Sequence, residues 1–310
     1  GDDYCFVKIL WGDEPEGTGF DYALDNSCGP GSIFSHAYIS PGKYTIKVLI
    51  SGGAWGNGDY ESNTKIREIR SYGRVRLERG AFNYTLDNFI IPENEIPYPL
   101  KSTEDFFSYS DFNGKIDHWD MSKVISSKNM FNQARKFNQP LYRWDVSSIE
   151  DMSSMFYLAT DFNQDISTWD VGNVTDMSQM FLGAVSFNQA IGEWNTSNVT
   201  NMNALFSGAR SFNQKLSNWN TSKVTDMSNM FSQFIDVGLK PHVEMTFNQD
   251  ISHFDMSNVI TVSKMFYDNS VFNQNLEAWD TSNVLDMSYM FAKTRDYNQP
   301  IEKWDTSKVT

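Results

Sequence analysis

Residues 162–186 read FNQDISTWDVGNVTDMSQMFLGAVS, and this 25-residue pattern recurs through most of the remaining chain. Its tryptophan, Trp169, marks the repeat most clearly. The equivalent positions hold Trp119, Trp144, Trp194, Trp219, Phe254, Trp279 and Trp304. Every interval is 25 residues except the 35 that separate Trp219 from Phe254, so the ten extra residues form one insertion near 235–244.

The unit predicts one coil of a repeat solenoid. A period of 25 residues lies within the range of leucine-rich-type repeats. Residues 174–177 are rich in β-branched residues and predict a short strand. Ser178 is expected to cap a short helix whose apolar side holds Met180, Phe181 and Ala184. The predicted fold class is therefore a leucine-rich-repeat-type solenoid with a short strand and a short helix per coil, whose aromatic residues form a stacked core.

The polar residues of the unit also recur, and each has two interpretations. Asn163 and its equivalents are expected to form an asparagine ladder that bonds backbone groups at a turn, rather than a ligand site. Four aspartates, Asp151, Asp176, Asp226 and Asp286, form a column on the predicted strands, with Asn201 and Thr261 in register. Structural Ca²⁺ would relieve the repulsion in such a column. The favoured interpretation is that these aspartates, and a second column of six that follows the aromatic anchors, accept backbone N–H bonds at turns. The second column consists of Asp120, Asp145, Asp170, Asp255, Asp280 and Asp305.

Three phrases of the repeat resemble a known family. WDVS at 144–147, DMSSMF at 151–156 and FNQDIS at 162–167 are similar to the BspA-like leucine-rich repeats, also called the bacterial surface protein repeat. The resemblance implies a secreted or surface-anchored protein, and some members of that family act in adhesion to host or matrix proteins.

The segment before the repeat has a different pattern. Residues 4–10 and 44–50 alternate apolar and polar residues, as half-buried strands do. WGD at 11–13, HAY at 36–38 and PGKYTIKV at 41–48 resemble a PKD-type immunoglobulin-like β-sandwich. The expected organisation is a PKD-like all-β module at 1–53, a glycine-rich linker at 54–63, degenerate amino-terminal capping repeats at 64–111 and regular repeats at 112–310.

The two cysteines, Cys5 and Cys28, lie close together in the first of these segments. A disulfide between them is the preferred prediction, and a free buried pair is the alternative. The sequence ends in mid-unit at Thr310, from which we expect the natural chain to continue.

Composition excludes several classes of protein. The chain carries 25 basic and 39 acidic residues, a formal charge of −14, which argues against nucleic acid as a partner. No apolar run reaches the roughly 18 residues that cross a bilayer, so no direct membrane insertion is expected. The HVE phrase at 242–244 has no cysteines after it to complete a deaminase zinc site. Catalysis needs one asymmetric site, so we expect no enzyme and no cofactor.

Two groups of residues outside the core are candidates for function. The predicted binding face consists of Thr175, Asp176, Thr200, Asn201, Thr225 and Asp226. The insertion adds a candidate specificity loop with Ile235, Asp236, Lys240, His242 and Glu244, for which a tolerated insertion without a role is an equal alternative.

Five Asn-x-Ser/Thr sequons make the chain a candidate glycoprotein. They lie at Asn83, Asn173, Asn195, Asn198 and Asn220.

The function predicted from the sequence is a non-enzymatic extracellular or cell-surface binding or adhesion protein, the surface of a virion included. Its partner would be an extracellular protein or a glycan, recognised on one face of the solenoid. The alternative is a structural subunit of a surface layer, filament or particle, in which the partners are copies of the chain itself.

Overall fold

The computed structural model describes residues 6–10, 21–23, 47–51, 54–55, 69, 76–77, 79–85, 89–97, 99–233 and 244–310. Cys5, Cys28 and residues 234–243 lie outside these ranges, and with them the predicted disulfide and most of the insertion.

The described part of residues 1–53 is one antiparallel sheet. Strand β1 (Phe6–Leu10) lies between β2 (Asp21–Ala23) and β3 (Lys47–Ser51). An immunoglobulin-like sandwich buries the inner faces of two sheets against each other, and the residues described here supply only one. The predicted PKD-like module is therefore wrong. Two further strands, β4 (Ala54–Trp55) and β5 (Arg76–Leu77), form a short parallel pair.

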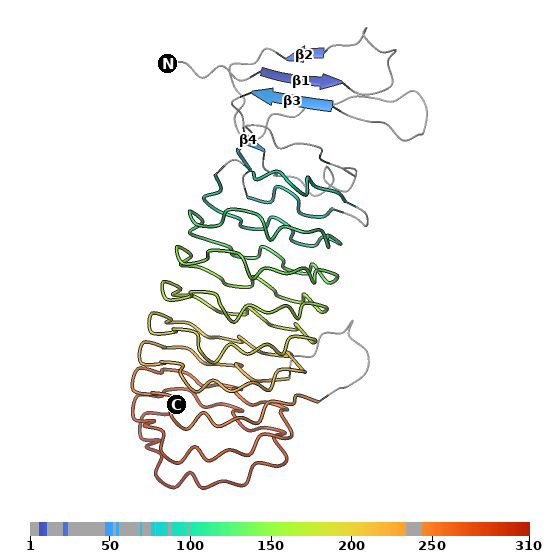
Figure 1. Cartoon of the computed structure of the whole chain (residues 1–310). Helices are drawn as coiled ribbons and strands as arrows, with labels where there is room; N and C mark the ends of the chain where they lie inside the picture. The colour runs from blue at the N-terminus through green and yellow to red at the C-terminus, as the bar shows by residue number, and fades with distance from the viewer. Residues whose placement is uncertain are drawn as a thin grey trace.

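From about residue 100 onward the chain winds into coils that stack along one axis (Figure 1). Neighbouring coils are joined by parallel bridges of a single residue each, such as Asp151 to Asp176 and Asp176 to Asn201. The series of bridges runs from Ser102 to Asp286. The strand predicted at 174–177 is therefore reduced to one bridging residue per coil.

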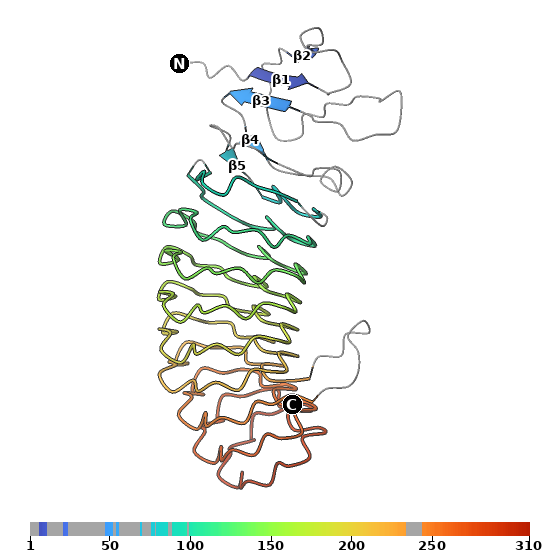
Figure 2. The ribbon, with the colours of Figure 1, turned by 45° about the vertical axis from the view of Figure 1, so that its right-hand side comes forward.

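The predicted helix is also absent: none occurs among the described residues, and the return side of each coil is a chain of tight turns (Figure 2). Met180 N–H donates to Met177 O within its coil, whereas Phe181 N–H donates to Leu205 O of the next coil. Gln179 and Gly183 have φ of 59° and 68°, in the left-handed region that interrupts a helix. The fold is a stack of irregular coils, and the predicted leucine-rich-repeat solenoid of strands and helices is wrong.

Aromatic rings fill the interior in columns that run along the stack. Phe156 stacks on Phe162 of its own turn at 3.9 Å between ring centroids and on Phe181 of the next coil at 5.7 Å. Trp169 stacks on Trp194 at 6.5 Å. These side chains are almost fully buried, so the recurring aromatic residues are core, as the repeat predicts.

Two ladders of polar bonds tie the coils together. The backbone N–H of Asn188 donates to Asn163 Oδ1 at 2.9 Å, and the same contact recurs from coil to coil, which confirms the predicted asparagine ladder. Each core tryptophan from Trp144 onward donates its indole N–H to a backbone carbonyl 28 residues earlier, as Trp194 does to Ile166 O at 3.2 Å.

The coil with Phe254 has no indole donor at this position. There the preceding residue, His253, places Nε2 at 3.1 Å from Leu216 O, the carbonyl that a tryptophan would have bonded. A neighbouring side chain thus takes over the missing hydrogen bond.

Candidate binding surface

One side of the stack carries a continuous row of exposed side chains, one from each coil. In this exposed row the backbone N–H of each residue donates to the carbonyl of the residue before it in the row, as Thr200 does to Thr175 at 2.9 Å. The exposed row consists of Ile125, Glu150, Thr175, Thr200, Thr225, Ile260, Leu285 and Thr310. Because these backbone groups are bonded along the stack, only the side chains of the row are available to a partner.

The threonines of the row present little polarity. Thr175, Thr200 and Thr225 donate their hydroxyls to the carbonyl of the preceding row residue at 3.1–3.2 Å. Ile125 is 57% exposed, and Ile260 is 42% exposed. Apart from the charged Glu150, the row is thus an exposed stripe of methyl and aliphatic groups on a chain whose net charge is −14. Contiguous exposed apolar surface is typical of interaction sites.

The six predicted binding-face residues lie in two different environments. The three threonines lie in the exposed row. Asp176, Asn201 and Asp226 lie half-buried beside it, where each accepts the backbone N–H of the residue two positions later. Each of the three already uses its Oδ1 atom within the chain, so the threonine set is the better candidate for contact.

The other two predicted Ca²⁺ ligands make the same turn. Asp151 accepts Ser153 N–H, and Asp286 accepts Ser288 N–H, both at 2.8 Å. Asn201 separates Asp176 from Asp226 in the column and donates to Asp176 Oδ2 at 3.3 Å. Among the described residues no group of three or more histidine, cysteine, aspartate or glutamate side chains is arranged to hold a metal ion. This geometry supports the turn interpretation.

The second column of aspartates also closes turns. Asp145 Oδ1 accepts the hydroxyl of Ser147 at 2.6 Å and its N–H at 3.1 Å. Hydrogen bonds to the serine lower the pKa of Asp145, and equivalent bonds lower the pKa of Asp255. Both bonds favour the charged carboxylate.

The sequons differ in how their amide groups are used. Asn173 and Asn198 donate Nδ2 to backbone carbonyls at 2.7 Å. Asn195 and Asn220 are exposed and use only Oδ1, which accepts the N–H of a serine in the turn. These two therefore stay the most accessible predicted acceptors, while Asn83 is half-buried.

Of the specificity-loop candidates, Ile235, Asp236, Lys240 and His242 lie outside the described residues. Glu244 is described and exposed, and it forms an ion pair with Arg295 at 3.6 Å.

The sequence interpretation did not include the aliphatic members of the row. These aliphatic residues could have been found in the sequence from their position directly after a valine of the core, as in Ile125 after Val124 and Leu285 after Val284. That alternation places the second residue on the solvent side of the coil.

A family model matches three overlapping or adjacent segments of the chain, residues 100–182, 164–237 and 241–310. Its description reads "Mycoplasma protein of unknown function, DUF285". This match overturns the resemblance to the BspA-like leucine-rich repeats. Searches of curated proteins and of solved structures gave no match. Within the described residues, no helix has the length and apolarity needed to span a bilayer.

Proposed function

The chain belongs to the family of Mycoplasma proteins of unknown function DUF285, and we propose that it is an extracellular or surface-exposed, non-enzymatic binding protein. The exposed row carries this proposal. Its partner is an extracellular protein or a glycan that lies along the row.

Three features of the row support binding. It extends over eight coils, so it offers many weak contacts along one line. Its backbone groups are bonded to each other, and its threonine hydroxyls are bonded to backbone carbonyls, so contact along the threonines does not require desolvation of unpaired polar groups. Its aliphatic side chains add apolar area that the core does not need.

The direct test is a screen of the full chain against panels of immobilised matrix proteins and glycans. We expect at least one specific binder, and we expect the triple variant Thr175→Lys, Thr200→Lys, Thr225→Lys to lose it. The matched control is Ser211→Lys, at an exposed position outside the row. Absence of any binder, or equal binding by the triple variant, would overturn the proposal.

A second experiment uses the same variants to examine self-assembly, by light scattering of the chain over a range of concentrations. A wild-type chain that assembles, together with a triple variant that stays monomeric, would assign the row to contacts between copies. That outcome would replace the binding function with the structural one.

A further inference from the structure

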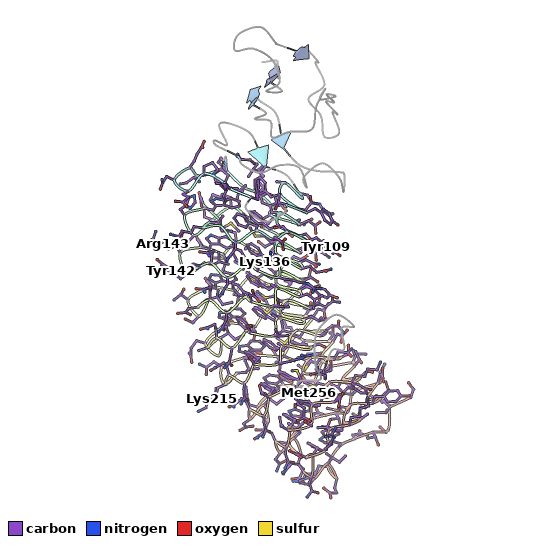
Figure 3. The ribbon with its side chains drawn as sticks, turned by 90° about the vertical axis from the view of Figure 1, so that its right-hand side faces the viewer. Tyr109, Lys136, Tyr142, Arg143, Lys215 and Met256 are labelled. Atoms are coloured by element: carbon purple, nitrogen blue, oxygen red, sulfur yellow. The ribbon has the colours of Figure 1, made fainter. Side chains whose placement is uncertain are left out.

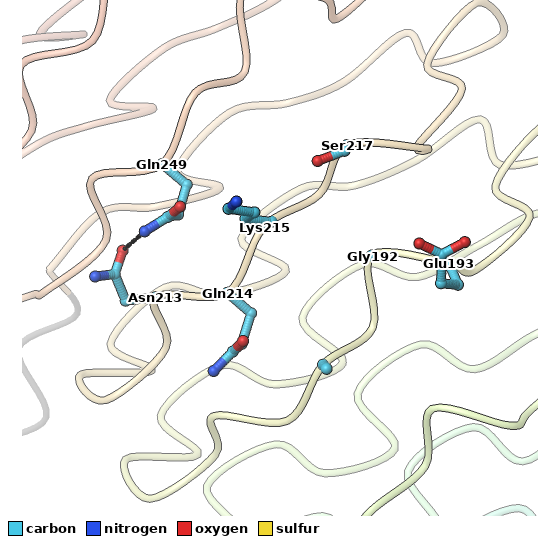
Figure 4. A pocket seen from close by; sticks show the side chains of 8 residues that line it. Gly192, Glu193, Asn213, Gln214, Lys215, Ser217 and Gln249 are labelled. Atoms are coloured by element: carbon cyan, nitrogen blue, oxygen red, sulfur yellow. Dashed lines mark hydrogen bonds between the residues drawn. The ribbon is translucent and has the colours of Figure 1, made fainter.

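A pocket of about 430 Å³ lies at the junction of three successive coils, and none of the residues of the exposed row lines it. It is lined by Ala190, Gly192, Glu193, Asn213, Gln214, Lys215, Ser217 and Gln249. Figure 4 shows Lys215 between Gln249 and Ser217, with Glu193 at the other end. Figure 3 places Lys215 on the same edge of the stack as Tyr142 and Arg143. Its volume falls in the range of small-molecule sites.

A turn hydrogen bond that the flanking coils make is missing from two adjacent coils that line the pocket. In the coil before them, Asp165 Oδ1 accepts Ser167 N–H at 2.9 Å, and in the coil after them Asp250 Oδ1 accepts Ser252 N–H at 2.9 Å. Ala190 and Lys215 occupy the positions of these aspartates and have no acceptor atom. Among the described residues, the N–H groups of Gly192 and Ser217 consequently have no protein acceptor.

Gly192 keeps this space open. A Cβ atom there would lie 2.5 Å from the backbone oxygen of Lys215 and 3.8 Å from Ser217 N, so the two coils approach too closely for a side chain. The coils that begin at Phe112 and Phe137 also lack the acceptor, but they carry the larger Asp117 and Tyr142 where the pocket has Gly192 and Ser217.

The unpaired groups define the chemistry of a ligand. Two backbone N–H groups one coil apart, in a pocket that Lys215 also lines, suit the oxygens of a carboxylate, the group that Asp165 and Asp250 supply in the flanking coils. Gln214 and Gln249 donate Nε2 to the asparagine ladder, and their Oε1 atoms accept no hydrogen bond from described residues. Glu193 uses Oε2 to accept from Asn218 at 2.7 Å. These oxygens suit ligand hydroxyls.

We propose that this pocket binds a sugar residue that carries a carboxylate, of the uronic acid class. The carboxylate accepts from Gly192 N–H, Ser217 N–H and the Lys215 ammonium. The sugar hydroxyls donate to Gln214, Gln249 and Glu193. This site uses none of the residues of the exposed row, so it stands or fails independently of the function proposed for that row.

The test is calorimetric titration of the full chain with a trisaccharide that ends in a uronic acid and with the same trisaccharide after reduction of its carboxylate to an alcohol. We expect the acid to bind and the reduced form to bind at least about tenfold more weakly, as expected for loss of charge-assisted hydrogen bonds. Lack of binding by the acid, or equal binding by the reduced form, would overturn the proposal.

Two variants test the geometry. Ala190→Asp restores the acceptor that Asp165 supplies in the coil before, so it should abolish binding without lowering the melting temperature. Lys215→Gln should weaken binding about tenfold, whereas the charge-matched control Lys223→Gln, outside the pocket, should not. Unchanged binding by Ala190→Asp or by Lys215→Gln would contradict the assignment of the pocket as a site for a sugar carboxylate.

Discussion

The hydrogen bond from His253 permits a quantitative test of how this coil tolerates Phe254 in place of the core tryptophan of the other coils. His253 Nε2 lies 3.1 Å from Leu216 O, which also accepts the backbone N–H of Trp219. The carbonyl therefore keeps one partner when the imidazole is removed, and the loss is that of one net hydrogen bond, about 1 kcal/mol. For a stack of this size that is a decrease in melting temperature of about 2–4 °C. We expect this decrease for His253→Ala.

The same substitution should be nearly silent once the indole is restored. In the Phe254→Trp background the new Nε1–H can reach Leu216 O, and we expect His253→Ala to lower the melting temperature by less than about 1 °C. The next coil already contains this combination, because Ala278 precedes Trp279, whose Nε1 donates to Ile251 O at 3.1 Å. Scanning calorimetry of the two singles and the double variant gives the coupling energy.

The matched control is Thr168→Ala, at the exposed position before Trp169, which should leave the melting temperature unchanged. An equal decrease for His253→Ala in both backgrounds would refute the reasoning. It would assign the contribution of the imidazole to its edge-on contact with Phe254, at 5.2 Å between ring centroids, and not to the hydrogen bond.

Three further predictions concern stability. Tyr297 stands where other coils have phenylalanine, and its buried hydroxyl has no hydrogen-bond partner among the described residues. Burial raises the pKa of this hydroxyl to about 12. Tyr297→Phe should therefore raise the melting temperature, and a decrease would contradict this. Asp145 and Asp255 have a lower pKa in the folded chain than in the unfolded one, so their stabilisation is present above about pH 4 and is lost as the pH falls further; calorimetry should show this loss, and the double variant Asp145→Asn, Asp255→Asn should lose less. Addition of EDTA should leave the melting temperature unchanged, because the aspartates of the predicted Ca²⁺ column accept backbone N–H groups, and a lower melting temperature would restore the Ca²⁺ interpretation.

The period, the aromatic core and the asparagine ladder could be predicted from the sequence because each depends on residue type at a fixed spacing. The absence of the helix could not be predicted in this way. Met180, Phe181 and Ala184 have helical spacing, yet the same three side chains also point inward from a chain of tight turns. The choice between the two depends on where the N–H groups find acceptors, and half of those acceptors belong to the next coil.

One signal in the sequence did argue against the helix. Gly183 and Gly208 lie inside the predicted helical segment at equivalent positions of adjacent units, and both have positive φ in the structure. A glycine that recurs at one position is typical of a left-handed backbone. Other coils place Leu158 or Lys293 there with positive φ as well, so residue type alone does not identify the conformation.

The candidate sites also differ in how far the sequence predicts them. The threonines of the exposed row follow from the alternation within one unit, whereas the pocket depends on two adjacent coils that both lack an acceptor. Neither Ala190 nor Lys215 is unusual alone, and the pocket becomes visible only when their coils are stacked beside those of Asp165 and Asp250.

The distribution of hydrogen bonds indicates where function is to be sought in this chain. Side chains that recur in most coils already have partners inside the stack: the asparagines bond the next backbone, the aspartates close turns, and the indoles bond carbonyls. A partner that engaged them would have to break bonds that hold the coils together. Positions at which the units differ carry no such penalty. The aliphatic residues of the exposed row and the pair Ala190 and Lys215 are such positions, so substitutions there should change binding while the stack keeps its stability.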